Sequence, residues 1–413
     1  MGRNIDHLFI HPGMPADEES ASVARLVRQW ADREIITRRM EYREGYHELF
    51  AEKRRKLCID IGLQKLTIPA ELGGFGWNSP SRAPALLSLA CETGRADAST
   101  GVLMASAWAL FLLLAGRSDF PEEPCRSLAG LYSGEEVRTP AFVLTGPGTV
   151  GVETPLFLGR SIPARVRGAK TGFTLSGTGI RPLIAGGMAD LFCMVCADES
   201  GTPRVALVPA DAEGVMRGPS VLMTGLNACG NAPIDLFSAP IPGANLLDRE
   251  GAVEELYTWL NLLLGGVSAG AGVNFFEILA DWSDSRVIKG GGTLKENPLC
   301  ASVLADVAGE VALARLLLGE LAGIVAARGE GAPGDVRRTY TYAGMIGQRV
   351  QEGVMRAMNR GLELMGSAGY AREWHVEKHW RDVKTIQSIL CGVGAEAPVK
   401  MDTARFFYDC REI

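Results

Sequence analysis

The sequence has no surplus of basic residues: 42 lysines and arginines stand against 48 aspartates and glutamates, for a formal net charge of −6. Proteins whose main partner is nucleic acid or an anionic membrane use lysine and arginine to neutralise phosphates. We therefore expect neither partner here. This balance still leaves room for a local basic pocket that holds one acidic cofactor.

Cysteine is also scarce, with 9 residues in a chain of 413. The cysteines lack the dense, even spacing of a disulfide scaffold, and the start Met1 to Asn4 lacks the apolar stretch of a signal peptide. Both absences favour a reducing environment, and we expect a cytoplasmic protein.

A clean membrane-spanning stretch is missing as well. The most apolar run, residues 259–276, is long enough to consider as a span, but polar residues and four glycines interrupt it, and Glu277 and Asp281 follow. Polar and charged groups are costly inside a bilayer. We expect a buried helix here and no membrane span.

Three regions with different hydrophobic patterns are present. Apolar residues recur at helical spacing from residue 18 to about 133 and again from 252 to the end, whereas short apolar runs separated by glycine and proline fill 138–248. Since 47% of the residues are hydrophobic, the chain can bury a sizeable core. The pattern predicts an α+β chain: an N-terminal helical domain (1–137), a central antiparallel β domain (138–248) and a C-terminal helical bundle (249–413), with a loop at 328–334.

Two glycine motifs match enzyme signatures without their structural context. Residues 146–151 fit G-x-G-x-x-G, but no helix is predicted to open after them, so a simple glycine loop is favoured over a dinucleotide site. Residues 266–270 fit G-x-S-x-G, but Ser268 lies inside a helical apolar segment. We expect its small neighbours to permit close helix packing.

Two pairs of metal-ligating residue types are also interpreted as structural. Cys193 and Cys196 lie in a predicted strand, where residues three apart point to opposite faces, so we expect both to fill the core. His375 and His379 lie one helical turn apart without a third ligand. We interpret them as a solvated or capping pair and expect no metal site.

Five segments agree in order and spacing with one known family. They are 68–76 (P-x-E-x-G-G-x-G), 92–99 (E-x-x-x-x-D-x-S), 144–147 (similar to T-E-P), 225–247 (similar to a strand pair ending in V-P-x-x-N-x-L) and 363–382 (similar to Q-x-x-G-G-x-G-Y, then R-D). With the helix, sheet, helix order, they resemble the acyl-CoA dehydrogenase family from about Glu18 to Phe407. The resemblance implies a tetramer that binds FAD, with the β domain over the flavin and the C-terminal helices as the subunit core.

The resemblance also implies which residues contact the cofactor. These are Thr145 in the T-E-P-like turn, Arg181 and Leu183 near the strand that cradles the flavin, Arg286 near the family's R-x-x-F-G turn, and Glu363, Gly366 and Gly369 in the most specific segment. For Arg181 the alternative is a surface arginine, which is the commoner case. The cradle departs from the family pattern, because the tryptophan and threonine of G-x-K-x-W-I-T are missing from residues 177–184.

The family's catalytic base is altered in this chain. Members remove a proton next to a thioester with a glutamate, while hydride leaves for the flavin. Cys391 stands at the usual position of that glutamate and Leu260 near the position used by some relatives. Cys391 is the candidate base if a helix end or a cation lowers its pKa; otherwise it fills space. Glu396, Glu254 and Glu255 lie near these positions as possible shifted carboxylates.

Three functions follow from the resemblance. The first is an FAD-dependent acyl-CoA dehydrogenase-like oxidoreductase in fatty acid metabolism, acting on an acyl-CoA or acyl-carrier thioester, with an electron-transferring flavoprotein as acceptor. The second is a non-catalytic subunit that pairs with a complete homologue, which would make a heteromer in place of a homotetramer. The third is a flavin monooxygenase of the same fold, which needs no base for the proton next to the thioester.

Overall fold

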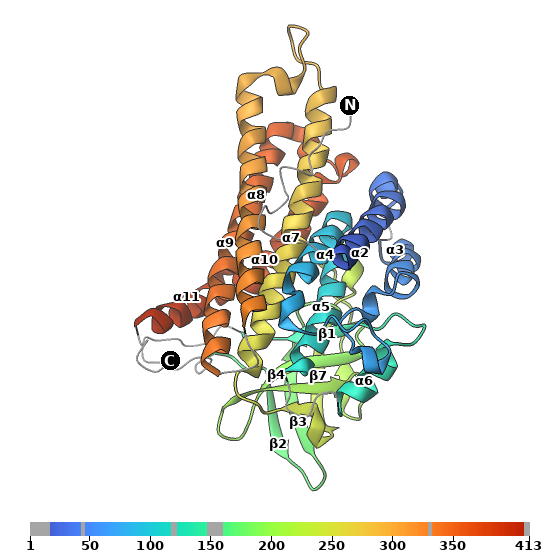
Figure 1. Cartoon of the computed structure of the whole chain (residues 1–413), viewed down its shortest axis with the longest axis vertical. Coiled ribbons are helices and arrows are strands. Elements are labelled where there is room, and N and C mark those ends of the chain that lie inside the picture. The colour runs from blue at the N-terminus through green and yellow to red at the C-terminus, as the bar shows by residue number, and fades with distance from the viewer. Residues whose placement is uncertain (1–16, 43–45, 117–121, 147–159, 329–332, 409–413) are drawn as a thin grey trace.

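The computed structural model describes residues 17–42, 46–116, 122–146, 160–328 and 333–408 (Figure 1). Its α-helices are α2 (Glu18–Trp30), α3 (Tyr46–Arg55), α4 (Ala83–Ala96), α5 (Ala98–Ala115), α6 (Cys125–Tyr132), α7 (Ala252–Ser285), α8 (Pro298–Ala327), α9 (Pro333–Met365), α10 (Val376–Cys391) and α11 (Val393–Tyr408). Its strands are β1 (Pro140–Val143), β2 (Ala164–Gly168), β3 (Phe173–Ile180), β4 (Leu191–Ala197), β5 (Pro203–Pro209), β6 (Val215–Arg217), β7 (Ile234–Ile241) and β8 (Leu246–Leu247).

The predicted order of helices, sheet and helices is confirmed, because every described strand lies between residues 140 and 247. The sheet lies at one end of the long C-terminal helices, and the N-terminal helices lie beside them (Figure 1). The limits of the three domains remain a prediction.

The central sheet is mostly antiparallel, with the strand order β6-β7-β3-β2-β4-β5-β8. It differs from a purely antiparallel sheet in that β4 pairs in parallel with β1 and with β2. Strand β4 is buried along its whole length, and Cys193 and Cys196 are both fully buried in it. The prediction that these two cysteines fill the core is confirmed.

The N-terminal helices are fixed by a cap and a turn. Asp97 ends α4 and caps α5 by accepting a hydrogen bond from Thr100 N at 2.9 Å. In the turn at 68–76, Gly73 and Gly76 have φ angles of 86° and 72°, which favour glycine over residues with a Cβ.

The C-terminal domain is built on three long helices, α7, α8 and α9, which run side by side (Figure 1). Two helices of the described chain, α5 and α7, are long and apolar enough to cross a membrane, but 94% of the apolar window of each is buried inside the protein. The expected buried helix at 259–276 is therefore confirmed as part of α7.

Small residues let α7 approach α4 closely. A Cβ added at Gly270 would lie 1.9 Å from the carbonyl oxygen of Cys91, and one at Gly266 would lie 2.9 Å from Ala90 Cβ. Ser268 lies between them in the middle of α7, and its hydroxyl donates to Gln351 Oε1 at 2.9 Å. This confirms that the G-x-S-x-G string serves helix packing. Of the G-x-G-x-x-G string, only Gly146 lies within the described residues.

Candidate functional site

A buried polar cluster lies where the β domain meets α7, α9 and α11. We call it the Arg160 cluster: Thr145, Arg160, Tyr257, Tyr340 and Asp402. Thr145 follows β1, and both its backbone N–H and its hydroxyl contact the Tyr257 hydroxyl, at 3.2 and 2.8 Å. The rings of Tyr257 on α7 and Tyr340 on α9 meet edge to face, with centroids 6.1 Å apart. The cluster therefore joins a β-domain turn to two helices of the C-terminal domain.

An ion pair closes the cluster from the side of α11. Asp402 Oδ2 accepts from the Arg160 guanidinium and from the Tyr340 hydroxyl, the latter at 2.8 Å. Both side chains of the ion pair are only 4% exposed. On the other carboxylate oxygen, Arg405 Nη1 lies 3.6 Å from Oδ1. One carboxylate thus sits among two guanidinium groups and a phenol in a nearly dry environment.

Burial shifts the acid groups of this region. Burial raises the pKa of Asp402, although Arg160 and the Tyr340 hydroxyl oppose that shift. Burial also raises the pKa of Tyr257, against hydrogen bonds to Thr145 and Arg160. Glu254, which precedes Tyr257 by one helical turn, is 9% exposed, and burial raises its pKa too. Among the described residues, Glu254 has no ion-pair partner.

Two of the expected cofactor residues lie together next to this cluster. Leu183 N donates to Phe142 O at 2.8 Å, so the segment after β3 runs along the end of β1, which leads into Thr145. Arg181 lies in the same segment and is exposed. Thr145, Arg181 and Leu183 therefore belong to one region of the β domain.

The other expected cofactor residues lie at the far end of the helices. Arg286 ends α7 and is exposed, and Glu363 ends α9, where it pairs with Arg360 at 3.4 Å. Since α9 rises about 1.5 Å per residue, Tyr340 and Glu363 lie about 35 Å apart along its axis. Within one chain, Thr145 contacts Tyr257 near the start of α7, whereas Arg286 follows the end of this 34-residue helix.

The turn after α9 has an open backbone. Gly366 has a φ of 58°, and a Cβ added there would meet nothing within 4 Å. Gly369, by contrast, is buried against the carbonyl oxygen of Leu362, which would lie 2.7 Å from an added Cβ. The outer side of the turn at Gly366 is therefore open.

Cys391 ends α10 and does not meet the condition for a base. Burial raises the pKa of its thiol to about 12, and the neighbouring carboxylates of Glu352 and Glu396 add to that shift, while Lys384 opposes it. A general base should instead have a pKa near the working pH. The catalytic role of Cys391 remains a prediction that its surroundings do not favour. An open groove of about 320 Å³ lies between α9 and α10, and Cys391 is not among the residues that line it.

The remaining positions for a base differ sharply in their surroundings. Leu260 is fully buried and apolar, as its sequence position implied. Glu255 is held by ion pairs to Arg249 and Arg328, and Glu396 pairs with Lys400 near the surface. Glu254 is therefore the carboxylate among these positions that is both buried and outside an ion pair in the described structure.

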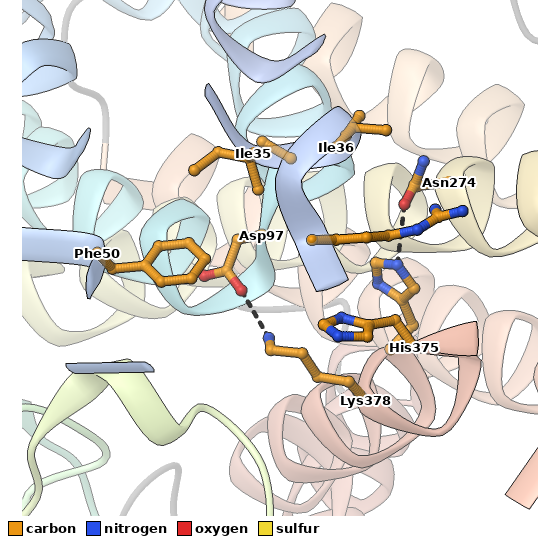
Figure 2. Close-up of a pocket in the computed structure, with 10 residues that line it drawn as sticks. Ile35, Ile36, Phe50, Asp97, Asn274, His375 and Lys378 are labelled. Atoms are coloured by element: carbon orange, nitrogen blue, oxygen red, sulfur yellow. Dashed lines mark hydrogen bonds and ion pairs between the residues drawn. The ribbon is translucent and has the colours of Figure 1, made fainter. Parts of the chain in front are cut away.

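A second buried charged group joins the three structural regions. Lys378 on α10 donates to Asp97 at the start of α5, at 2.6 Å, and to Asp382 at 2.5 Å, and Asp382 accepts from Leu226 N of the β domain at 2.7 Å. Figure 2 shows Asp97 and Lys378 facing each other. The adjoining cavity is about 20 Å³, room for about one water. It is too small for a flavin or a substrate.

The two histidines beside this cavity correct a prediction. His375 and His379 are each only 6% exposed, and His375 makes no side-chain cap to α10, so they are not a solvated or capping pair. His379 Nε2 lies 3.0 Å from Asn274 Oδ1 on α7 (Figure 2). Burial lowers the pKa of His379 well below its usual value. Among the described residues, no three His, Cys, Asp or Glu side chains lie close enough together to hold a metal ion.

Sequence reasoning missed most of the Arg160 cluster. Arg160 and Asp402 are 242 residues apart, and neither lies in a recognisable motif. For Tyr257 and Tyr340 the available signal was weak: each is a polar-tipped aromatic in an otherwise buried helix face. The ion pairs of Lys378 were easier to anticipate from the sequence, because its partners Asp97 and Asp382 lie in two of the segments that resemble the family.

Comparisons with known proteins agree along nearly the whole chain. The family model for the acyl-CoA dehydrogenase N-terminal domain matches residues 17–120, and that for the C-terminal domain matches 243–393. A cyclohex-1-ene-1-carbonyl-CoA dehydrogenase of Syntrophus aciditrophicus is 24% identical over 387 residues, which cover 90% of this chain and 86% of that protein.

Solved structures share the fold at lower identity. Butyryl-CoA dehydrogenase from Megasphaera elsdenii superposes with a TM-score of 0.76 at 18% identity, over 95% of this chain and 99% of that one. Nitroalkane oxidase in complex with spermine superposes with a TM-score of 0.80 at 14% identity, over 96% of both chains. The arrangement of helices and sheet in this chain is therefore the one found in these enzymes.

Proposed function

The chain belongs to the acyl-CoA dehydrogenase family, whose members are flavoprotein oxidoreductases with FAD as cofactor, and we propose that it oxidises an acyl thioester. The names of two similar proteins, cyclohex-1-ene-1-carbonyl-CoA dehydrogenase and butyryl-CoA dehydrogenase, support an acyl-CoA substrate. An acyl-carrier thioester is the other form of the same substrate class.

The residues fit an FAD held between two copies of the chain. Thr145 and the 181–183 segment would contact the flavin at the β-domain end. The open turn at Gly366, which follows α9, and Arg286, which follows α7, would receive other parts of the cofactor at the far end of these helices. This separation is the observation that carries the proposal. One chain places the flavin-contacting residues and the residues at the far end on opposite ends of its C-terminal helices. A complete FAD-binding site therefore needs a second copy of the chain.

The exposed face of α8 supports such an assembly. Leu313, Leu316 and Leu317 lie on one side of this helix with exposed fractions of 56, 39 and 37%. Contiguous exposed leucines mark interaction surfaces more often than free surface. We propose that a copy of this chain covers this face in a homotetramer. Sedimentation of the wild type and of Leu313→Glu/Leu317→Glu tests this: the variant should sediment as a smaller species.

We propose Glu254 as the proton acceptor. Its raised pKa brings a carboxylate closer to neutral pH, which suits a general base, and it lies one turn from the tyrosine that contacts Thr145. When bound, FAD would supply the hydride acceptor for this oxidation. The Glu254 carboxylate would take the proton from the carbon next to the thioester, which leaves a carbon–carbon double bond.

The test is an absorbance scan of purified protein followed by anaerobic addition of acyl-CoA. We expect a flavin spectrum that bleaches with substrate, and a rate about a hundredfold or more lower in Glu254→Gln. Glu396→Gln, a surface carboxylate paired with Lys400, is the matched control and should keep the rate. Equal rates in all three proteins would exclude Glu254 as the base.

A colourless protein that binds tightly to a homologue would favour the non-catalytic subunit instead. The Arg160 cluster supports keeping that alternative, because side chains of the chain itself occupy the space next to Thr145. For the active enzyme, we propose a cytoplasmic location and an electron-transferring flavoprotein as the electron acceptor. Reduction of such a flavoprotein by substrate-reduced enzyme would test the second point.

A further inference from the structure

We propose that Arg160, Tyr257 and Tyr340 form a carboxylate-binding site for the acyl chain of the substrate, and that Asp402 occupies this site in the ligand-free chain. The substrate would then be a thioester whose acyl chain carries a second carboxylate. The inference takes from the proposed function only that the substrate is a thioester. It adds that the acyl chain of this thioester carries a second carboxylate.

The surroundings of Asp402 are those of a bound carboxylate ligand. A single oxygen, Oδ2, accepts from the Arg160 guanidinium and from the Tyr340 hydroxyl. Arg405 reaches the other oxygen at 3.6 Å. Arginine with a hydroxyl donor is the set that recognises carboxylates with geometric specificity. Arg160 and Tyr340 come from outside α11, so these two donors remain when α11 moves, whereas Arg405 lies on α11 and moves with Asp402.

The site lies beside the proposed chemistry. Tyr257 contacts the Thr145 hydroxyl at 2.8 Å, and burial together with the hydrogen bonds of Thr145 and Arg160 controls its pKa. Glu254 is one turn away on the same side of α7, and Asp402 acts on its charge state. A carboxylate bound here would belong to the same molecule that reacts at the thioester end.

The proposed exchange requires the helix that carries Asp402 to move away from Arg160. Helix α11 packs mainly against α9 and α10, and Pro398 lies inside it, where proline weakens a helix. A buried ion pair also gives little net stability, because the loss of hydration offsets the attraction. Exchange of the Asp402 carboxylate for a substrate carboxylate therefore replaces one ion pair with a similar one.

The experiment measures binding to the full-length protein as purified, by titration calorimetry. The probes are the glutarate monothioester of CoA, pentanoyl-CoA, and the glutarate monothioester of pantetheine, which lacks the CoA phosphates. The proteins are the wild type, Asp402→Asn, Arg160→Gln/Asp402→Asn, and Glu310→Gln. The last removes one negative charge from an exposed pair with Arg356 and serves as the control.

We expect Asp402→Asn to bind both glutarate thioesters about tenfold or more tightly than the wild type does, because the competing carboxylate is gone. The affinity for pentanoyl-CoA should stay unchanged. The double variant should lose this preference, and Glu310→Gln should match the wild type. Arg160→Gln alone would remove the closest cation from the buried Asp402 carboxylate and could destabilise the fold, so the double variant keeps the test independent of folding.

Two results would overturn the inference. One is an unchanged ratio of glutaryl to pentanoyl affinity in Asp402→Asn. The other is an equal gain for both CoA esters without a gain for the pantetheine ester, which would assign the site to a CoA phosphate. The ratio needs no flavin reduction, so a protein inactive in the redox assay can still support or overturn it.

Discussion

Lys378 on α10 lies 2.6 Å from Asp97, the residue that caps α5, and their side chains are 6% and 2% exposed. The same ammonium group reaches Asp382, whose carboxylate accepts from the backbone of the β domain at Leu226. One buried cation thus connects the N-terminal helices, the β domain and the C-terminal helices. The fold holds its three parts together at this point, away from the Arg160 cluster.

Replacing Lys378 with methionine should be strongly destabilising. Asp97 and Asp382 would remain buried without a cation, which typically costs about 3–5 kcal/mol. Urea unfolding followed by tryptophan fluorescence measures the change. Lys384→Met, on the exposed side of the same helix, is the control and should stay within about 0.5 kcal/mol. Equal midpoints for the two variants would show that the buried ion pairs contribute little.

His379 should make stability depend on pH below neutrality. Burial lowers the pKa of the folded ring well below 6.5, whereas the unfolded ring titrates near its ordinary value. As the pH falls through about 6.5, the unfolded chain gains a proton that the folded chain does not, so stability falls by up to about 1.4 kcal/mol per pH unit.

The matched variant for this pH effect is His379→Gln, which keeps a donor toward Asn274 but cannot titrate. Urea unfolding at several pH values between about 7 and 5 should show a shallower loss of stability in the variant than in the wild type. Parallel curves would mean that another group causes the acid sensitivity.

Hydrophobic periodicity was sufficient to predict the order of helices and sheet. Burial of a helix face or of alternating strand residues leaves a repeating pattern of apolar residues in the sequence. The polar residues of the 259–276 segment are too many for a membrane span but fit a buried helix. The pairing of β4 with β1 and β2 in parallel leaves no such local record.

The site could be predicted only in part. Thr145 and Leu183 were singled out because family motifs mark them, and their contact with the cofactor stays a prediction. Arg160 and Asp402 were not, because their ion pair depends on how α11 folds back onto the β domain. The prediction that His375 and His379 are solvated was wrong for a similar reason. The charged residues of α10 suggest a solvated helix, but Lys378 and Asp382 form an ion pair inside the protein.

Cys391 should be unreactive toward iodoacetamide near neutral pH. With a pKa raised to about 12, its thiolate fraction is about a thousandfold below that of an ordinary thiol. Peptide mapping by mass spectrometry can compare it with Cys300, which lies partly exposed in the first turn of α8. Slow labelling of Cys391 beside faster labelling of Cys300 is expected. Equally fast labelling of the two would restore Cys391 as a candidate base.

Gly270→Ala should separate α4 from α7 and destabilise the chain. The new Cβ would lie 1.9 Å from the carbonyl oxygen of Cys91, a rigid backbone atom, so one of the helices must shift. Overpacking of this kind costs about 1–3 kcal/mol.

The control for that substitution is Gly130→Ala in α6, where a Cβ meets nothing within 4 Å. It should instead stabilise the helix by about 0.5–1 kcal/mol, because alanine loses less backbone entropy than glycine. Urea midpoints should therefore move in opposite directions for two chemically identical changes. If both moved upward, α4 and α7 would not be in the close contact that the structure shows at Gly270.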